Sequence, residues 1–429
     1  MKVIIQSIFT IAGIMLSGFC AAQNYTSYFT GDVADVGLAP AFGMVLMGGA
    51  GEDDEAMKWF LQRANGGDVV VIRTSGSDGY NDYLYSDLGI DVNSVETIVF
   101  ENALASNDSY VIQQLQNAEA IWIAGGSQAA YVSMWRNTPV EEAINHLLLV
   151  KGGVVGGTSA GMAIMAGRYF GALNGTITSG QALTNPYNSL VTIGHNDFVS
   201  APFLHNTLTD THFDNPDRRG RMAVFMARLY TDQGIVPTGI ACDEYAAVCI
   251  GSDGIAQCYG EAPQYDDNVY FVRPNCLDPI GPETCISGSP LTWDRGGEAL
   301  KIYRIKATSD GSRTFDLNNW LTGSGGEWLN WSVQSGTFNE SIGATAPDCS
   351  ITEVQEFSEN SEELLYPNPT SGLVTLPLEW IGKTALIYSS DGRLVHNRLI
   401  TESIIDLRNI PPGFYLIMVE QKSFRLVKE

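Results

Sequence analysis

The sequence predicts an α/β protein with a doubly wound, mostly parallel sheet, followed by a small all-β sandwich at the C-terminus. Across residues 42–165, short and nearly continuous apolar runs alternate with helical patterns. Strands that are apolar on both faces are typical of parallel sheets covered by helices. Residues 243–339 are richer in strands and loops, and residues 301–305 alternate clearly. After residue 363, short alternating strands separated by turn signals predict the sandwich.

The elements of the parallel region follow in chain order. The apolar runs that predict buried strands are 44–47, 69–72, 97–100, 121–123 and 154–155. The helical patterns are 55–64, 109–118 and 138–151, followed by a further one after residue 161. In the third helix Thr138 is a candidate N-cap and Pro139 stands at the first helical position, while Glu141 completes a capping box. Lys151 and Gly152 suit its C-terminal end.

Three glycine pairs are predicted to end strands of this sheet: 48–49, 125–126 and 156–157. The carboxyl ends of parallel strands lie along one edge, and ligands of doubly wound sheets bind in the crevice there. The pairs therefore predict a single site at that edge.

Charge divides the chain and excludes some functions. Of the formal charge of −24, residues 362–429 contribute 8 acidic and 7 basic side chains, so nearly all of the excess lies before them. So acidic a surface repels phosphate backbones and anionic lipids, which argues against nucleic-acid and membrane-surface roles. We predict a signal peptide over 1–22, a large α/β domain over 23–344, a linker over 345–363 and a separate domain over 364–429.

The N-terminal segment has the pattern of an export signal. Lys2 is its one charge, an apolar stretch covers residues 3–16, and Ala21-Ala22 supply small residues before the expected cleavage point. The apolar stretch is too short for a transmembrane helix, so no transmembrane segment is predicted. The alternative is a buried N-terminal strand or helix.

Six of the seven cysteines follow the predicted signal peptide, and an even number in an exported chain is compatible with disulfide bonds. Cys276 and Cys285 flank a loop rich in glycine and proline and form the best local pair. Metal binding is the weaker interpretation, because there is no Cys-x-x-Cys and no histidine in this region. No metal or organic cofactor is predicted.

The candidate nucleophile is Ser159, in the segment Gly157-Thr158-Ser159-Ala160-Gly161. In a Gly-x-Ser-x-Gly nucleophile elbow, small flanking residues allow a sharp turn between strand and helix that projects the hydroxyl. Backbone N–H groups at the helix start can stabilise an oxyanion. The alternative is a glycine-rich turn with a purely structural role.

A nucleophilic serine needs a base, and His212 is the first candidate. His205 is the runner-up, in a loop shortly before it. Arg218, Arg219 and Arg221 follow closely. Such a cluster is usually a solvated face, but in so acidic a chain it could bind a substrate carboxylate.

These segments together resemble the cyanophycinase and dipeptidase E family of serine peptidases, from about Met44 to Leu317. The resemblance is carried by the four segments Gly125-Gly126-Ser127-Gln128, Gly156–Gly161, Asp210–Phe213 with Arg218–Arg221, and Gly239–Glu244. It implies a fold related to class I glutamine amidotransferases, with Ser159 as nucleophile and His212 as general base. It also implies an oxyanion hole at the amides of Gly126 and Ala160. The positions that match the substrate pocket are Gln128, Asp210 and Arg221.

The chain departs from this family in one respect. The family places an acidic residue between serine and histidine to orient the imidazole, whereas residues 160–196 contain none. Gln181 stands roughly where that acid is expected and is a possible orienting residue, although an amide cannot stabilise an imidazolium by charge. The alternative is another carboxylate, for which Asp197, Asp210 and Glu244 are the candidates. The family acts on aspartyl or β-aspartyl peptides, and Thr211 departs from the cyanophycinase pattern.

The C-terminal segment resembles the sorting domain of the type IX secretion system. The match rests on the motif Leu365-Tyr366-Pro367-Asn368-Pro369, the turn Asp391-Gly392, and Gly413-Phe414-Tyr415. The resemblance implies passage across the outer membrane with that machinery as partner, and a secreted or cell-surface location. A small carbohydrate-binding or adhesive β-module is the alternative.

The sequence as a whole therefore predicts an exported serine peptidase that hydrolyses peptide substrates. Two alternatives stay open. One is a non-catalytic surface binding protein that keeps the fold, and the other is an esterase, which shares the same pentapeptide.

Overall fold

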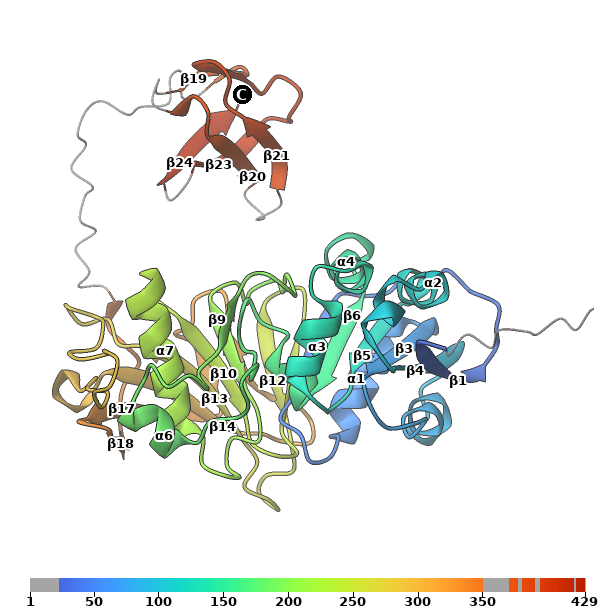
Figure 1. Ribbon diagram of the computed structural model, residues 1–429, viewed down its shortest axis with the longest axis horizontal. Helices are drawn as coiled ribbons and strands as arrows, with labels where there is room; N and C mark the ends of the chain where they lie inside the picture. The colour runs from blue at the N-terminus through green and yellow to red at the C-terminus, as the bar shows by residue number, and fades with distance from the viewer. Residues whose placement is uncertain (1–22, 350–369, 377–379, 390–393, 420–421, 429) are drawn as a thin grey trace, which may run out of the picture. The chain divides into compact units, whose positions relative to one another are not determined.

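The computed structural model describes residues 23–349, 370–376, 380–389, 394–419 and 422–428 (Figure 1). The predicted signal peptide and residues 350–363 of the predicted linker lie outside the described residues. The chain divides into two compact units, Met1–Cys349 and Ser350–Glu429. Among the described residues, no helix has the length and apolar character needed to cross a bilayer.

The first sheet of the larger unit has a parallel centre with antiparallel additions on both sides. Its strands, in spatial order, are β1 (Tyr25–Gly31), β4 (Ser94–Phe100), β3 (Asp68–Arg73), β5 (Ala120–Ile123), β6 (Val154–Thr158), β2 (Gly43–Met47), β11 (Ala247–Ile250), β12 (Ile255–Tyr259), β15 (Arg313–Asp316) and β16 (Gly323–Ser324). Strands β4, β3, β5, β6 and β2 are parallel to one another. The five strands predicted from apolar runs form this parallel centre.

Helices cover both faces of the parallel centre. Helix α1 (Asp54–Ala64) packs Phe60 against the ring of Trp122 on β5, at 5.3 Å between centroids. The core on the other face includes residues of α2 (Ser109–Asn117), α3 (Gln128–Trp135) and α4 (Pro139–His146). The predicted doubly wound α/β class is therefore confirmed.

The predicted caps of α4 are only partly correct. The Thr138 hydroxyl accepts a hydrogen bond from Val140 N at 3.3 Å. Glu141, however, accepts from the amide of Asn137, one residue before the N-cap, so the predicted capping box is wrong. The helix continues as a π-helical turn, η3 (Leu147–Lys151), and Gly152 ends it with φ of 69°. Lys151 binds Glu119 at 2.7 Å and donates to backbone carbonyls at the end of α2.

The second sheet of this unit is mostly antiparallel. Its order is β18 (Thr337–Ser341), β17 (Gly326–Gln334), β14 (Leu300–Lys306), β13 (Asn268–Pro274), β10 (Thr238–Cys242), β9 (Thr207–Asp210), β7 (Arg168–Phe170) and β8 (Ile193–His195). Only β10, β9 and β7 run parallel to one another. Helices α6 (Ser179–Thr184) and α7 (Arg219–Gln233) contribute to the apolar core beside this sheet. The remaining short turns are η1 (Tyr83–Asp87), η2 (Ala103–Asn107) and η4 (Arg295–Gly297).

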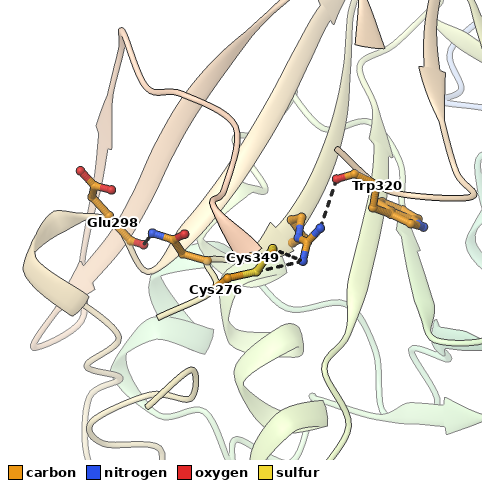
Figure 2. The surroundings of a disulfide bond; sticks show 6 residues. Cys276, Glu298, Trp320 and Cys349 are labelled. Atoms are coloured by element: carbon orange, nitrogen blue, oxygen red, sulfur yellow. Dashed lines mark hydrogen bonds between the residues drawn. A yellow bond between two sulfur atoms is a disulfide. The ribbon is translucent and has the colours of Figure 1, made fainter. Parts of the chain in front are cut away.

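A disulfide bond joins Cys276 to Cys349, so the predicted pair of Cys276 with Cys285 is wrong (Figure 2). The segment after β18 returns to the end of β13, a long-range approach that local spacing does not reveal. Arg273 donates to both sulfur atoms at 3.3 Å. Cys285 is a buried free thiol, and burial raises its pKa.

The smaller unit is all-β in its described part, as predicted. One sheet pairs β19 (Leu373–Thr375) with β22 (Ile404–Asp406), and the other has the order β21 (Leu394–Leu399), β20 (Thr384–Ser389), β23 (Gly413–Val419), β24 (Lys422–Lys428). Its own apolar core includes the buried Trp380, Ile387 and Ile417.

One of the three glycine pairs does not end a strand. As expected, Gly48-Gly49 directly follows β2, and Gly125-Gly126 comes one residue after the end of β5. Gly156 and Gly157, however, lie inside β6. A Cβ on Gly156 would lie 2.4 Å from the Trp122 ring, and one on Gly157 would lie 2.7 Å from the backbone of Gly161. This third pair therefore serves close packing, and the turn itself begins at Ser159.

Candidate active site

Ser159 stands on a sharp turn between β6 and the short helix α5 (Ala160–Ala163). Its φ and ψ are 51° and −113°, a conformation that costs a non-glycine residue free energy and is typical of functional turns. Glycine is required on the helix side, because a Cβ on Gly161 would lie 2.1 Å from the carbonyl oxygen of Ile123. The Ser159 amide donates to Met47 O of β2 at 3.0 Å, which fixes the turn to the neighbouring strand.

A chain of hydrogen bonds leads from Ser159 through His212 to Glu244. Ser159 Oγ lies 2.8 Å from His212 Nε2, and His212 Nδ1 lies 2.7 Å from Glu244 Oε1. With Nδ1 protonated, the imidazole donates to the carboxylate and accepts from the hydroxyl, which is the arrangement that a general base needs. The His212 and Glu244 side chains are 24% and 21% exposed, so water and a ligand can reach these hydrogen-bonded groups.

Glu244 meets His212 because β9 and β10 are parallel neighbours. Asp210 ends β9 and Cys242 ends β10, so two further residues bring both side chains to the same edge of the sheet. The hydrogen bond from His212 holds the pKa of Glu244 below its ordinary value, so the carboxylate is ionised at neutral pH. Of the three carboxylates that the sequence left open, Glu244 is the one in contact with the imidazole.

Gln181 does not orient His212, which corrects the sequence-based expectation. Its side-chain oxygen accepts from the amide and hydroxyl of Thr178, and the Thr178 hydroxyl accepts from the Gln181 amide, which forms a capping box at the start of α6. Asp197 is also engaged elsewhere, with Arg136 at 2.6 Å and the Tyr169 hydroxyl at 2.7 Å.

The glycine pair after β2 holds the two sides of the site together. His212 N donates to Gly48 O at 2.9 Å, and Tyr245 N donates to Gly49 O at 3.0 Å. A Cβ on Gly49 would lie 2.5 Å from His212 Nε2 and 3.1 Å from Ser159 Cβ, and the residue has φ of +112°. Only glycine can adopt this positive φ without strain and also leave room for the His212 and Ser159 side chains.

The loop after His212 completes the frame around Glu244. Asp214 Oδ1 accepts from Glu244 N at 3.0 Å, and Asn215 Nδ2 donates to the second carboxylate oxygen at 3.5 Å. The adjacent Asp243 is buried, and its Oδ2 accepts from the amide and side chain of Asn268. Burial raises the pKa of Asp243 to about 7.

The two amides expected to form an oxyanion hole are at the same edge. Ala160 is the first residue of α5 and directly follows Ser159. A Cβ on Gly125 would lie 3.6 Å from Ser159 Cβ, so the turn that contains Gly126 borders the nucleophile. The Tyr131 hydroxyl donates to the carbonyls of Ala124 and Gly125 at 2.9 and 3.0 Å, which fixes this turn. The role of the Gly126 and Ala160 amides as oxyanion donors stays a prediction.

Arg221 and Asp210, which match positions near the substrate pocket, form a buried ion pair, and their predicted contact with substrate stays a prediction. Arg221 Nε donates to Asp210 Oδ2 at 2.8 Å and Nη2 to the other oxygen, and the side chains are 4% and 3% exposed. Arg218 donates to Thr211 O at 2.8 Å, and Arg219 pairs with Asp217 and Glu340. The cluster joins the end of β9 to α7 and so supports the position of His212.

Gln128 is the first residue of α3 and is half-buried. Its Nε2 donates to Phe170 O at 2.6 Å, a contact that connects α3 to the end of β7. The amide oxygen of the side chain is the group that it still offers to a ligand. Its predicted contact with substrate stays a prediction.

Glu244 carried one weak signal in the sequence. It follows the apolar strand 238–242, which is the last strand before the chain becomes mostly antiparallel. Asp243, in contrast, gave no signal, because its burial depends on the pairing of β10 with β13. In the described residues, no group of histidine, cysteine and acidic side chains is arranged to bind a metal ion.

Two segments of the chain match models of known protein families. Residues 75–257 match the model of Peptidase family S51, and residues 364–429 match the Secretion system C-terminal sorting domain. A cyanophycinase of Synechococcus elongatus is 25% identical over 227 residues, which cover 51% of this chain and 66% of that protein. One of Geminocystis herdmanii (strain PCC 6308) is 25% identical over 241 residues, which cover 52% and 83%. The chain thus spans just under two thirds of the first relative.

Among solved structures, a peptidase from an acI-B1 Actinobacterium aligns with a TM-score of 0.42 and 14% identity, over 65% of this chain and 98% of that one. A putative Peptidase E protein from Listeria monocytogenes EGD-e aligns with a TM-score of 0.32 and 15% identity, over 52% and 99%. The sequence matches support the family resemblance: residues 75–257 are similar to peptidase family S51, and residues 364–429 match a sorting domain of the type IX secretion system, which indicates export to the cell surface or the medium.

Proposed function

We propose that this protein is an exported serine peptidase with Ser159 as nucleophile, His212 as general base and Glu244 as the residue that orients the imidazole. The observation that carries the proposal is the hydrogen-bonded chain from Ser159 Oγ through His212 to Glu244. The match to peptidase family S51 supports peptide hydrolysis as the reaction class.

The mechanism follows from the geometry of this chain. His212 Nε2 takes the hydroxyl proton as Ser159 Oγ attacks the peptide carbonyl, and the negative charge of Glu244 stabilises the imidazolium that forms. The amides of Gly126 and Ala160 hold the oxyanion. The imidazolium then protonates the leaving amine, the C–N bond breaks, and an acyl-enzyme remains. Water attacks this ester with His212 again as base, and the hydroxyl of Ser159 is restored.

For the substrate we propose peptides with aspartyl or β-aspartyl features. The support is the similarity to proteins named cyanophycinase, at 25–26% identity. Passage through the type IX machinery brings the enzyme to peptides outside the cell, and the C-terminal domain is the part proposed to contact that machinery.

Labelling with a serine-reactive fluorophosphonate tests the nucleophile. The wild-type protein is expected to react once per chain, whereas Ser159→Ala and His212→Ala do not. Ser133→Ala is a matched control, because Ser133 is an exposed serine on α3 whose hydroxyl donates to Ala129 O. Absence of labelling in correctly folded wild-type protein would contradict the proposal and favour a binding protein. A panel of aspartyl, β-aspartyl and ester substrates then separates peptidase from esterase.

A further inference from the structure

An open cavity of about 440 Å³ lies at the carboxyl edge of the first sheet, where β3 ends at Arg73 and the loop after β2 contains Glu52. Its lining residues are Glu52, Asp54, Arg73, Gly79, Tyr80 and Tyr83. The volume falls within the range of about 300–1,000 Å³ that is usual for small-molecule sites. None of these residues has a role in the chemistry proposed above.

The cavity and the nucleophile share one edge and one loop. Glu52 follows Gly49 by three residues, and a Cβ on Gly49 would contact both His212 and Ser159. Three residues span at most about 11 Å. On the other side, Arg73 ends β3, whose neighbour β5 leads to the Gly125 turn beside Ser159. A substrate bound at Ser159 can therefore extend into the cavity.

Within the described residues, no salt bridge joins Arg73 to a carboxylate, although Glu52 and Asp54 line the same cavity. Its two side-chain hydrogen bonds go to backbone carbonyls, those of Ser75 and Ser77. The loop wraps closely around the guanidinium, since a Cβ on Gly76 would lie 2.4 Å from Arg73 Nη2. Arg218, Arg219 and Arg221, in contrast, all lie near carboxylates. Arg73 is thus fixed in place with its charge left for an anion.

Two of the other lining residues, Glu52 and Asp54, are acidic, and each accepts a hydrogen bond from a tyrosine of the same cavity. The Tyr80 hydroxyl donates to Glu52 Oε1, and the Tyr83 hydroxyl donates to Asp54 Oδ1 at 2.8 Å. Burial and the neighbouring carboxylates raise the pKa of both tyrosines, so they stay donors. Each carboxylate has about four acceptor sites, so one hydrogen bond leaves capacity for a cationic ligand group.

We propose that this cavity is a specificity subsite for a dipolar end of the substrate. A carboxylate of the ligand binds Arg73, and a cationic nitrogen of the same ligand binds Glu52 and Asp54. A simple anion would face two carboxylates, and a simple cation would face Arg73, so a ligand with both charges matches the cavity best. The inference rests on the proposed function only for the claim that the occupant is part of a substrate.

Two kinds of peptide end carry this pair of charges: a C-terminal lysine or arginine, and an N-terminal aspartate or glutamate. Binding to the uncleaving Ser159→Ala protein, measured by calorimetry, distinguishes them. The pairs are a lysine-ending peptide and its C-terminal amide, and an aspartate-starting peptide and its asparagine analogue. We expect at least one of the two dipolar peptides to bind at least tenfold more tightly than its own analogue without the carboxylate. Equal binding within both pairs would overturn the proposal.

Arg73→Gln in the same background is expected to abolish the preference for the carboxylate. Glu52→Gln with Asp54→Asn is expected to weaken the binding of the dipolar peptide, because its cationic nitrogen then has no carboxylate partner in the cavity. Arg73→Lys keeps the charge and is expected to retain part of the preference, which separates charge from loop stability. Lys58→Gln is the matched control, because Lys58 pairs with Glu55 on α1 outside the cavity. A preference that survives Arg73→Gln would overturn the subsite.

Turnover and labelling separate this inference from the proposed function. With Ser159 present, Arg73→Gln should raise the KM of the preferred dipolar peptide at least tenfold, change the neutralised peptide little, and leave fluorophosphonate labelling unchanged. An equal loss on both peptides would overturn the subsite while labelling still supports the nucleophile. Unlabelled wild-type protein would contradict the nucleophile, and the calorimetric comparison would still decide on the subsite.

Discussion

Two hydrogen-bonded pairs of side chains begin two residues apart, at Asp210, the last residue of β9, and at His212, and they differ in almost every physical respect. His212 and Glu244 are 24% and 21% exposed and share one hydrogen bond. Arg221 and Asp210 are 4% and 3% exposed and share two. The first pair borders Ser159, whereas the second lies between β9 and α7.

The difference shows how burial separates reacting groups from supporting ones. A partly exposed imidazole next to a carboxylate can take up the proton of the nucleophile, because Glu244 stabilises the charge that forms. A buried bidentate pair has no charge left for a ligand, and its separation would leave an ion in an apolar environment. The four predictions below test this contrast, in order of decreasing expected effect.

Glu244→Gln is expected to lower kcat by a factor on the order of 10³–10⁴ with little change in KM, because the amide keeps the shape of the side chain but not its charge. Steady-state kinetics on the best substrate of the panel measures both constants. Glu327→Gln is the control, since Glu327 forms an exposed pair with Arg304. A loss below tenfold would mean that Glu244 does not support the imidazolium.

Arg221→Met is expected to lower the free energy of unfolding by about 3–5 kcal/mol, because Asp210 is then buried without a partner. Urea denaturation of the full chain measures this loss. The double variant with Asp210→Leu should recover much of it, since two apolar side chains can replace a buried pair. If Arg221→Met instead raises KM and leaves stability unchanged, Arg221 binds substrate as the sequence suggested.

Features of this fold that depend on local sequence could be predicted, whereas features that depend on contacts between distant segments could not. The turn at Ser159 was predictable because its small neighbours and the flanking strand and helix are all local. The parallel strands were predictable because each is an apolar run of its own. The contact of Glu244 with His212 depends on β9 lying beside β10, and the burial of Arg221 depends on α7 packing near the second sheet. No local pattern carries that information.

Asp243 extends the contrast to pH. Burial raises its pKa in the folded protein from 3.8 to about 7, so folding takes up a proton between those values. Stability from this group is therefore fully present below about pH 4 and is lost as the pH rises through about 7.

Asp243→Asn removes this titration. The variant should gain stability relative to wild type as the pH rises from 5 to 8, by on the order of 1–3 kcal/mol at the upper end. Thermal unfolding at several pH values measures the difference. Asp253→Asn is the control, because Asp253 lies on the turn before β12, away from Asn268. A difference in stability between variant and wild type that stays constant across pH would show that Asp243 does not titrate in this range.

Gln181→Ala is expected to have the smallest effect and to separate a cap from a catalytic contact. Loss of the capping box at α6 should cost about 0.5–2 kcal/mol of stability, as for other helix N-caps. Thr178→Ala should cost a similar amount, because both side chains belong to the same box. Neither change should alter kcat, since Gln181 has no hydrogen bond to His212 in the described structure. If Gln181→Ala lowers kcat tenfold while Thr178→Ala does not, the glutamine acts on the imidazole in a state of the enzyme that differs from this one, and Glu244 does not orient His212 alone.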